Sequence, residues 1–288
     1  MGSELLNTII NNKYSINIQI GNGKFGSIYL GTNLKKKSNV VVKFEDTNNN
    51  FITLKNEATI LKYLYENNCH DVPTIQWYGI HLNYLSIVIP KYDCSLYDYR
   101  YSNNSKLPYN SLCEAIVSII SIINNIHDLF VIHRDIKPHH FMLRNGKIYL
   151  IDFGISTFYV DENKKLKRNE INENSVIGSS NYASINLYNG NCYSRRDDLI
   201  SICYTIIFLF TLELPWENVS TYSINDKYNS SSIYNSKNIK YKNLKDLNNL
   251  SSICNKINSN LALLIDDCYS LDFYDEPNYI KYISYFHT

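Results

Sequence analysis

The pattern G-x-G-x-x-G occurs near the start of the chain, in Gly21-Asn22-Gly23-Lys24-Phe25-Gly26. Because glycine lacks a side chain, backbone N–H groups in such a segment can approach phosphate oxygens closely. The pattern leads into an expected strand at residues 27–30, whereas a dinucleotide-binding turn would open a helix. It also lacks the Gly-Lys-Ser/Thr ending of a Walker-type loop. Taken alone, the pattern leaves a phosphate-binding hairpin and an ordinary hairpin turn both open.

A lysine that could contact phosphates follows on a later strand. Lys43 ends the apolar segment at residues 40–42, and a lysine in that position is usually only a solvated surface residue. Its interpretation changes if an acidic partner is present, and Glu57 lies in the next expected helix. Such a pair would aim the ammonium group at a bound nucleotide. The sequence therefore predicts an ion pair between Lys43 and Glu57.

Two carboxylates follow short apolar strands further along the chain. Asp135 lies in His133-Arg134-Asp135-Ile136-Lys137-Pro138, and Asp152 opens Asp152-Phe153-Gly154. One carboxylate can orient and accept the proton of a hydroxyl group, and another can bind Mg²⁺. Lys137 would place a cation beside a transferring phosphoryl group. Together with the glycine-rich segment and Lys43, these motifs occur in the order and on the elements found in protein kinases, which they resemble.

The elements expected to position these residues divide the chain into a strand-rich part and a helix-rich part. Alternating apolar and polar residues predict three strands within residues 14–44, then strands at residues 74–78 and 85–89. Helical periodicity predicts helices at residues 54–67, 112–129, 199–212 and 261–271. This order predicts an α+β fold with two lobes, and a cleft between lobes is a natural ligand site.

Composition excludes some classes of protein. The 288 residues include 28 basic and 27 acidic side chains, which gives a net charge of +1 and indicates neither nucleic-acid binding nor membrane binding. The apolar run at residues 199–212 is shorter than the roughly 20 residues of a membrane span, so we expect a core helix there. The biased stretch at residues 218–260 contains recurring Ile, Leu and Tyr, which favours loops joined to short helices.

The seven cysteines are scattered, without a C-x-x-C pair, and the chain shows no secretory leader. These features predict reduced thiols in a reducing intracellular compartment, the cytoplasm or the nucleus.

At a finer level the chain resembles the casein kinase 1 family from about residue 14 to residue 286. The resemblance rests on IGNGKFGSIYLG, VPTIQWYG, HRDIKP, YASIN, SRRDDL, LPW and DEPNYI. YASIN, at residues 182–186, stands where most other kinases carry A-P-E. The resemblance implies a monomeric serine/threonine protein kinase that uses ATP and Mg²⁺. It also implies a β-sheet N-lobe with one helix at residues 1–90 and a mainly helical C-lobe at residues 91–288.

The resemblance also assigns roles to individual positions. Asp135 and Lys137 would be catalytic, Asp152 would bind the metal, and Asp198 would support the backbone of the His133–Asp135 turn. Residues 90–92 would form the hinge between the lobes. The residues expected to bind ATP are Ile20, Gly21, Gly23, Gly26, Ile28, Lys43, Glu57, Ile89 and Tyr92.

One departure from the family concerns the second metal ligand. Five residues after Asp135 the family has Asn, whereas this chain has His140, with His139 beside it. An amide oxygen suits Mg²⁺, whereas an imidazole nitrogen suits Zn²⁺ or Mn²⁺ better. Three hypotheses follow: slower catalysis on one well-held metal, a nucleotide-binding pseudokinase without turnover, and an altered metal preference. Since the other catalytic positions are retained, we favour activity.

A second departure concerns the substrate. Asn181 stands where the family usually has an Arg that helps to bind substrates already phosphorylated nearby, although Lys227 would keep another basic member of that anion site. A preference for phosphorylated or acidic substrates therefore stays open. Residues 161–174 are expected to form a solvated loop of mixed charge in the activation segment.

Overall fold

The computed structural model describes residues 4–22, 26–48, 53–102, 107–169, 178–217 and 242–287. The chain forms two compact units. The first unit comprises Met1–Cys94 and Met142–Ser156, and the second comprises Ser95–Phe141 and Thr157–Thr288. The lobe boundary that we expect near residue 90 stays a prediction.

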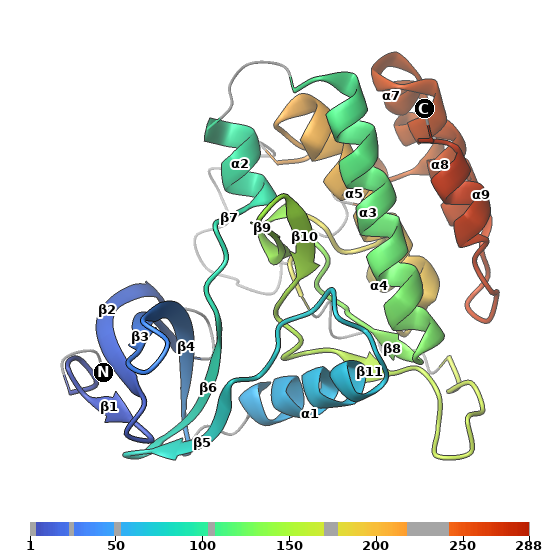
Figure 1. The fold of residues 1–288 in the computed structure, drawn as a ribbon. Coiled ribbons are helices and arrows are strands. Elements are labelled where there is room, and N and C mark those ends of the chain that lie inside the picture. The colour runs from blue at the N-terminus through green and yellow to red at the C-terminus, as the bar shows by residue number, and fades with distance from the viewer. Residues whose placement is uncertain are drawn as a thin grey trace, which may run out of the picture. The chain divides into compact units, whose positions relative to one another are not determined.

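A six-stranded antiparallel sheet dominates the first unit (Figure 1). Its strands, in spatial order, are β1 (Ile9–Ile10), β2 (Tyr14–Asn22), β3 (Ser27–Asn33), β4 (Ser38–Asp46), β6 (Tyr84–Pro90) and β5 (Trp77–His81). Every second residue of β3 is buried, as alternation along a half-buried strand requires, and Val40, Val42 and Phe44 continue the pattern in β4. The core of the sheet includes Tyr29, Val42 and Phe44, whose exposed fractions are at most 1%.

The helix α1 (Thr53–Glu66) packs against β4 and β6. Leu54, Ala58 and Leu61 recur at helical spacing on its buried face. The start of the helix is bound to the sheet, because the Glu45 carboxylate of β4 accepts hydrogen bonds from the backbone N–H groups of Thr53 (3.0 Å) and Leu54 (2.7 Å). An acceptor of this kind satisfies N–H groups that the first turn of any helix leaves without a partner. One strand thus fixes the position of α1.

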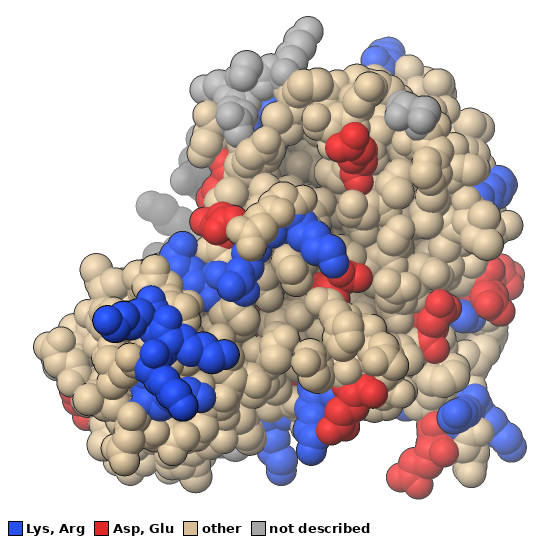
Figure 2. Space-filling model, in the orientation of Figure 1, with Lys and Arg blue, Asp and Glu red and all other residues tan. Residues whose placement is uncertain are grey.

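Figure 2, drawn in the orientation of Figure 1, shows Lys and Arg side chains gathered over β2, β3 and β4 on the face turned toward the viewer. The turn between β3 and β4 contributes three exposed lysines, Lys35, Lys36 and Lys37.

A second, three-stranded sheet has the order β10 (Lys147–Leu150), β9 (Phe141–Arg144) and β7 (Cys94–Ser95). The β10 strand leads directly to Asp152.

The second unit is mainly helical (Figure 1). Its helices are α2 (Leu96–Ser102), α3 (Tyr109–Asp128), α4 (Ile185–Tyr188), α5 (Arg195–Thr211), α7 (Leu247–Ile257), α8 (Ser259–Ser270) and α9 (Tyr279–Ser284), with the short 3₁₀ helix η1 (Pro138–His140). The strands β8 (Val131–Ile132) and β11 (Thr157–Phe158) pair in this unit. From Asp197 to Leu209 α5 is buried, and it packs against α3, α7 and α8. The second unit is therefore built around α5.

Among the described helices, α3 alone is long and apolar enough by composition to cross a membrane. Its residues Leu112, Ile116, Ile119, Ile123 and Ile126 are nevertheless buried at helical spacing, and the helix packs against α5 and α9. This buried stripe is typical of a core helix.

The α+β class predicted from the sequence is confirmed, and most long elements lie close to their expected positions. The strand expected at residues 74–78 begins only at Trp77, so that prediction was wrong by three residues. The helix α5 begins at Arg195, four residues before the expected start, because Ser194 and Asp197 form a capping box.

Candidate active site

The ion pair predicted between Lys43 and Glu57 is present in the first unit. The Lys43 ammonium group lies 2.8 Å and 3.0 Å from the two carboxylate oxygens of Glu57 and 3.0 Å from Oδ1 of Asp152. The Glu57 side chain is 2% exposed, whereas that of Asp152 is 43% exposed. One lysine therefore joins a buried carboxylate of α1 to a carboxylate that reaches solvent.

The surroundings of Lys43 favour its protonated, positively charged form. Burial alone would lower the pKa of Lys43, but Asp152 and Glu57 outweigh burial and raise it above the ordinary value of lysine. A buried carboxylate such as Glu57 is costly without a cation, so the two charges depend on each other. The resulting ammonium group is fixed in place, as required of a group that binds phosphate oxygens.

Asp152 is held by the backbone that follows it. Its φ of 71° lies in the left-handed region, which is uncommon for a residue with a side chain and frequent at functional sites. Asn56, on α1, donates hydrogen bonds from its amide nitrogen to the carbonyl oxygens of Phe153 (3.3 Å), Gly154 (3.0 Å) and Ser156 (2.9 Å). The helix that carries Glu57 therefore also positions the turn that carries Asp152. Asn56 was not predicted from the sequence, where its only signal is that it precedes Glu57.

The glycine-rich segment joins β2 to β3, and Gly21 pairs with Ile28 across the two strands. A Cβ atom at Gly26 would lie 1.9 Å from the carbonyl oxygen of Phe44, so a larger residue cannot replace it without displacing β4. Gly26 is therefore required for this close backbone approach, and its contact with phosphate stays a prediction. Gly23 lies outside the described residues.

Three further residues expected to bind ATP, Ile20, Ile89 and Tyr92, belong to the same unit. Ile20 is 53% exposed, whereas Ile89 and Tyr92 are 2% and 6% exposed. The Tyr92 ring lies 5.1 Å from that of Tyr149, measured between centroids. Burial places Ile89 and Tyr92 in the packed interior, and their contact with a nucleotide stays a prediction.

Asp135, in the second unit, forms a closed group with Lys137 and Ser179. The Lys137 ammonium group lies 2.9 Å from Oδ2 of Asp135 and donates to Oγ of Ser179 at 2.7 Å. The backbone N–H of Ser179 donates to Oδ1 of Asp135 at 2.8 Å. Asp135 and Lys137 were predicted from the sequence as site residues, whereas Ser179 was not.

The electrostatics of this group keep Asp135 ionised. Burial alone would raise the pKa of Asp135. The nearby His140 and Lys137, together with hydrogen bonds from Lys137 and Ser179, outweigh this effect and hold the pKa below its ordinary value. Such a carboxylate is a weak base. The geometry therefore suits orientation of a hydroxyl group, with the proton accepted late in the reaction.

Asp198 holds the backbone of the turn that carries Asp135. Its two carboxylate oxygens accept hydrogen bonds from the backbone N–H groups of His133 (2.7 Å) and Arg134 (2.9 Å), as expected from the sequence. Arg134 has a φ of 73°, and Nε2 of His127 lies 3.0 Å from the same carboxylate. Burial would raise the pKa of Asp198, but the hydrogen bond from His127 and the nearby histidines lower it. A charged carboxylate therefore stabilises an uncommon backbone conformation next to Asp135.

His140 turns its ring back onto the same loop. Its Nδ1 lies 2.9 Å from the backbone carbonyl oxygen of Asp135. A carbonyl only accepts hydrogen bonds, so Nδ1 carries the hydrogen and the lone pair of the neutral ring lies on Nε2. His139 instead stacks on Tyr97, with ring centroids 3.8 Å apart. Of the two adjacent histidines, His140 is thus the candidate metal ligand, and its donor atom is nitrogen rather than oxygen.

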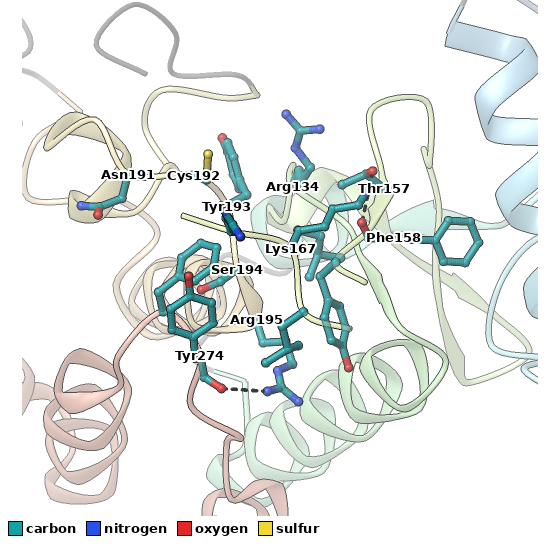
Figure 3. A pocket seen from close by; sticks show the side chains of 15 residues that line it. Arg134, Thr157, Phe158, Lys167, Asn191, Cys192, Tyr193, Ser194, Arg195 and Tyr274 are labelled. Atoms are coloured by element: carbon teal, nitrogen blue, oxygen red, sulfur yellow. Dashed lines mark hydrogen bonds between the residues drawn. The ribbon is translucent and has the colours of Figure 1, made fainter. Parts of the chain in front are cut away.

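A cavity of about 440 Å³ lies in the second unit (Figure 3). Arg134, which directly precedes Asp135 in the sequence, is one of its lining residues. Its lining includes the cationic residues Arg134, Lys167, Arg168 and Arg195 but no Asp or Glu. Arg195 is fixed there, because it donates to the carbonyl oxygens of Tyr274 (3.3 Å) and Asp275 (3.0 Å). This lining suits an anionic group. The anion site expected at Lys227 cannot be compared with it, since Lys227 lies outside the described residues.

A comparison with protein families agrees with these contacts. A family model described as a protein kinase domain matches residues 14–281, which is most of the chain. The matched range contains the glycine-rich segment, Lys43, Glu57, Asp135 and Asp152.

Proposed function

The chain belongs to the protein kinase superfamily, and on that premise we propose that it transfers the γ-phosphoryl group of ATP to Ser and Thr hydroxyls of protein substrates. The observation that carries the proposal is the position of Lys137, whose ammonium group contacts both Asp135 and Ser179. In the sequence motif of Ser/Thr kinases, a cationic residue typically stands two positions after the catalytic carboxylate. The motifs YASIN and SRRDDL support a place close to the casein kinase 1 family.

In the mechanism that we propose, each charged group has one task. Lys43, held by Glu57, binds the α- and β-phosphates. Asp135 orients the acceptor hydroxyl, and Lys137 stabilises the charge that develops on the γ-phosphoryl group. Both groups are held by hydrogen bonds before any substrate binds, so little reorganisation accompanies transfer.

The donor atoms determine which metal ion fits. Asp152 offers carboxylate oxygen atoms on a side chain that is 43% exposed, and such oxygens suit Mg²⁺. His140 offers nitrogen at the position of the second ligand, which suits Mn²⁺ better than Mg²⁺. When bound, the metal ion neutralises the phosphate oxygens. We propose that Asp152 holds Mg²⁺ and that His140 weakens binding of a second ion.

A direct assay tests this proposal. Casein is incubated with ATP labelled at the γ-phosphate, with Mg²⁺ and separately with Mn²⁺, and the labelled amino acids are identified after hydrolysis. We expect label on phosphoserine and phosphothreonine. Absence of label with both metal ions, from protein that binds ATP, would favour the second candidate function described next.

The second candidate is a nucleotide-binding pseudokinase that engages partners without turnover. The observation in its favour is His140, which replaces an oxygen ligand by nitrogen. The substitution His140→Asn separates the two functions. For an active kinase with one weak metal site we expect an increase of about tenfold or less in a rate already measurable with Mg²⁺, and a smaller change with Mn²⁺. A large gain from no detectable activity would instead assign the native chain to the pseudokinases.

A finer proposal concerns the substrate. We propose that an acidic or phosphorylated residue of the substrate binds in the cavity lined by Arg134, Lys167 and Arg195 (Figure 3). Phosphorylated and enzymatically dephosphorylated casein provide matched substrates. We expect the phosphorylated form to have the lower KM, with a difference that shrinks in Lys167→Ala, because Lys167 is an exposed member of the lining. Equal KM values for the two forms of casein would contradict this proposal and leave the phosphotransfer itself untouched.

A further inference from the structure

Lys245 is a lysine buried completely in the second unit, with an exposed fraction of 0%. Lysine is almost never fully buried unless its polar end is bound. Its Nζ donates hydrogen bonds to the carbonyl oxygens of Ser180 (3.0 Å) and Ala183 (2.6 Å). Three aromatic rings surround it at 4.9 to 5.1 Å from their centroids, those of Tyr188, Tyr204 and Trp216. The side chain therefore binds both ends of one four-residue segment, residues 180–183.

All four carbonyl groups of this segment are bound by side chains. Besides the two bonds from Lys245, the indole N–H of Trp216 donates to Asn181 at 2.7 Å and the hydroxyl of Ser201 donates to Tyr182 at 2.7 Å. The hydroxyl of Tyr188 adds a bond to Ser180 at 2.7 Å. Apart from Tyr188, the donors lie 19 to 65 residues from their acceptors, so tertiary structure fixes the segment.

The segment continues without a break into the catalytic group. The carbonyl oxygen of Ser179 accepts from the backbone N–H groups of Tyr182 (2.9 Å) and Ala183 (3.0 Å). On the other side, Ser179 donates its own N–H to Asp135 and accepts from Lys137. A displacement at Ala183 is therefore transmitted to Asp135 through a single residue, Ser179.

The residue before Ser179 confirms how close this approach is. Gly178 has a φ of 92°, and a Cβ atom there would lie 2.6 Å from the carbonyl oxygen of Arg134 and 3.2 Å from Oδ1 of Asp135. Only glycine permits both the conformation and the contact. The segment of residues 178–183 therefore packs closely, through Gly178, against the turn that carries Asp135.

We propose that Lys245 is a positioning residue for phosphoryl transfer, because its two hydrogen bonds hold residues 180–183 so that Ser179 fixes Asp135 and Lys137. The proposal rests on the proposed kinase function. It does not depend on the charge of Lys245: burial lowers the pKa of Lys245 well below its ordinary value, but a neutral amine still has two N–H donors for two carbonyl groups. An apolar side chain of similar length has none.

The test compares Lys245→Met with Lys242→Met, which removes an exposed lysine three residues earlier. For Lys245→Met we expect kcat to fall by about 10- to 100-fold while KM for ATP stays unchanged, since a small misplacement of a catalytic group has an effect of that size. Lys242→Met should match the wild type in both. Should Lys245→Met fail to fold, Trp216→Phe keeps an aromatic ring but removes the bond to Asn181 and part of the buried indole, and it should lower kcat by several-fold.

A second measurement does not require turnover. Hydrogen–deuterium exchange of the backbone amides of residues 179–183 should be faster in Lys245→Met than in the wild type, and unchanged in Lys242→Met. If the wild type transfers no phosphate, the kinase proposal fails, yet exchange at Ser179 still decides whether Lys245 positions this segment. Unchanged exchange in folded Lys245→Met overturns the inference, whether or not kcat falls.

Discussion

The two units hold their reactive groups by different means. In the first unit Lys43, Glu57 and Asp152 bind one another directly, as charged side chains. In the second unit, Asp135 is held largely through the backbone, by the N–H of Ser179 and by the Asp198 carboxylate bound to the turn before it. The first arrangement depends on three charges, whereas the second depends on a segment whose position many side chains share.

This difference has an energetic consequence. Removing one partner of a buried ion pair leaves an uncompensated charge and costs about 3 to 5 kcal/mol. Removing one of several hydrogen bonds to the backbone costs about 1 to 3 kcal/mol and shifts the segment only in part. We therefore expect loss of the ion pair in the first unit to have a large effect, and loss of one backbone hydrogen bond in the second unit to have a graded effect.

The largest effect is expected for Lys43→Met. It removes the contact that we propose with the nucleotide phosphates and leaves the carboxylates of Glu57 and Asp152 without their cation. Labelled phosphate transfer should be abolished, and the free energy of unfolding should fall by about 3 kcal/mol in urea titrations. Because the pKa of Lys43 is raised, its stabilising contribution is complete below the ordinary lysine value of 10.5 and is lost as the pH rises through the raised pKa.

The control for this substitution is Lys62→Met, on the exposed side of the same helix. The Lys62 side chain is 72% exposed and lies 3.8 Å from Glu66, so its removal should change the free energy of unfolding by less than about 0.5 kcal/mol. Wild-type transfer by Lys43→Met would remove the first unit from the mechanism.

A smaller effect is expected for Asn56→Ala. This substitution sharpens the comparison between ion pairs and backbone hydrogen bonds, because Asn56 binds backbone carbonyl groups within the first unit. The substitution removes the donor to Phe153, Gly154 and Ser156 but leaves the Lys43–Glu57 pair intact. We expect kcat/KM for ATP to fall by about tenfold, because the Asp152 turn loses its support. Asn67→Ala, just beyond the same helix, is the matched control, since Asn67 is exposed and its side-chain amide donates to the carbonyl oxygen of Tyr63. Equal rates for the two variants would show that the ion pair alone positions Asp152.

The same difference explains which contacts could be predicted from the sequence. The pairing of Lys43 with Glu57 follows from complementary charges on a strand and the next helix. The hydrogen bonds that the Asp198 carboxylate accepts follow from its place in a recognised motif. Asn56 and Lys245 bind carbonyl groups, which every residue carries and which therefore leave no mark in the sequence. Lys245 is also 62 residues beyond Ala183, in a stretch with several other lysines.

The fold shows a parallel contrast. The long helices α3 and α5 could be predicted because their apolar residues recur over many turns or form an unbroken run. The short helices α2 and α9, of 7 and 6 residues, were missed because so few residues carry almost no periodicity. Their positions come from packing against the rest of the second unit, which the sequence alone does not display.

The most direct test of the account is the rate of phosphate transfer by Asp135→Asn. Asparagine keeps the shape of the side chain and an oxygen that can accept from Ser179. It removes the charge that, in the proposed mechanism, orients the acceptor hydroxyl and receives its proton. With casein, ATP and Mg²⁺, we expect a rate about 1,000-fold below the wild type, with unchanged affinity for an ATP analogue. Asp128→Asn, at an exposed position at the end of α3, should behave as the wild type. Transfer by Asp135→Asn at the wild-type rate would contradict the account.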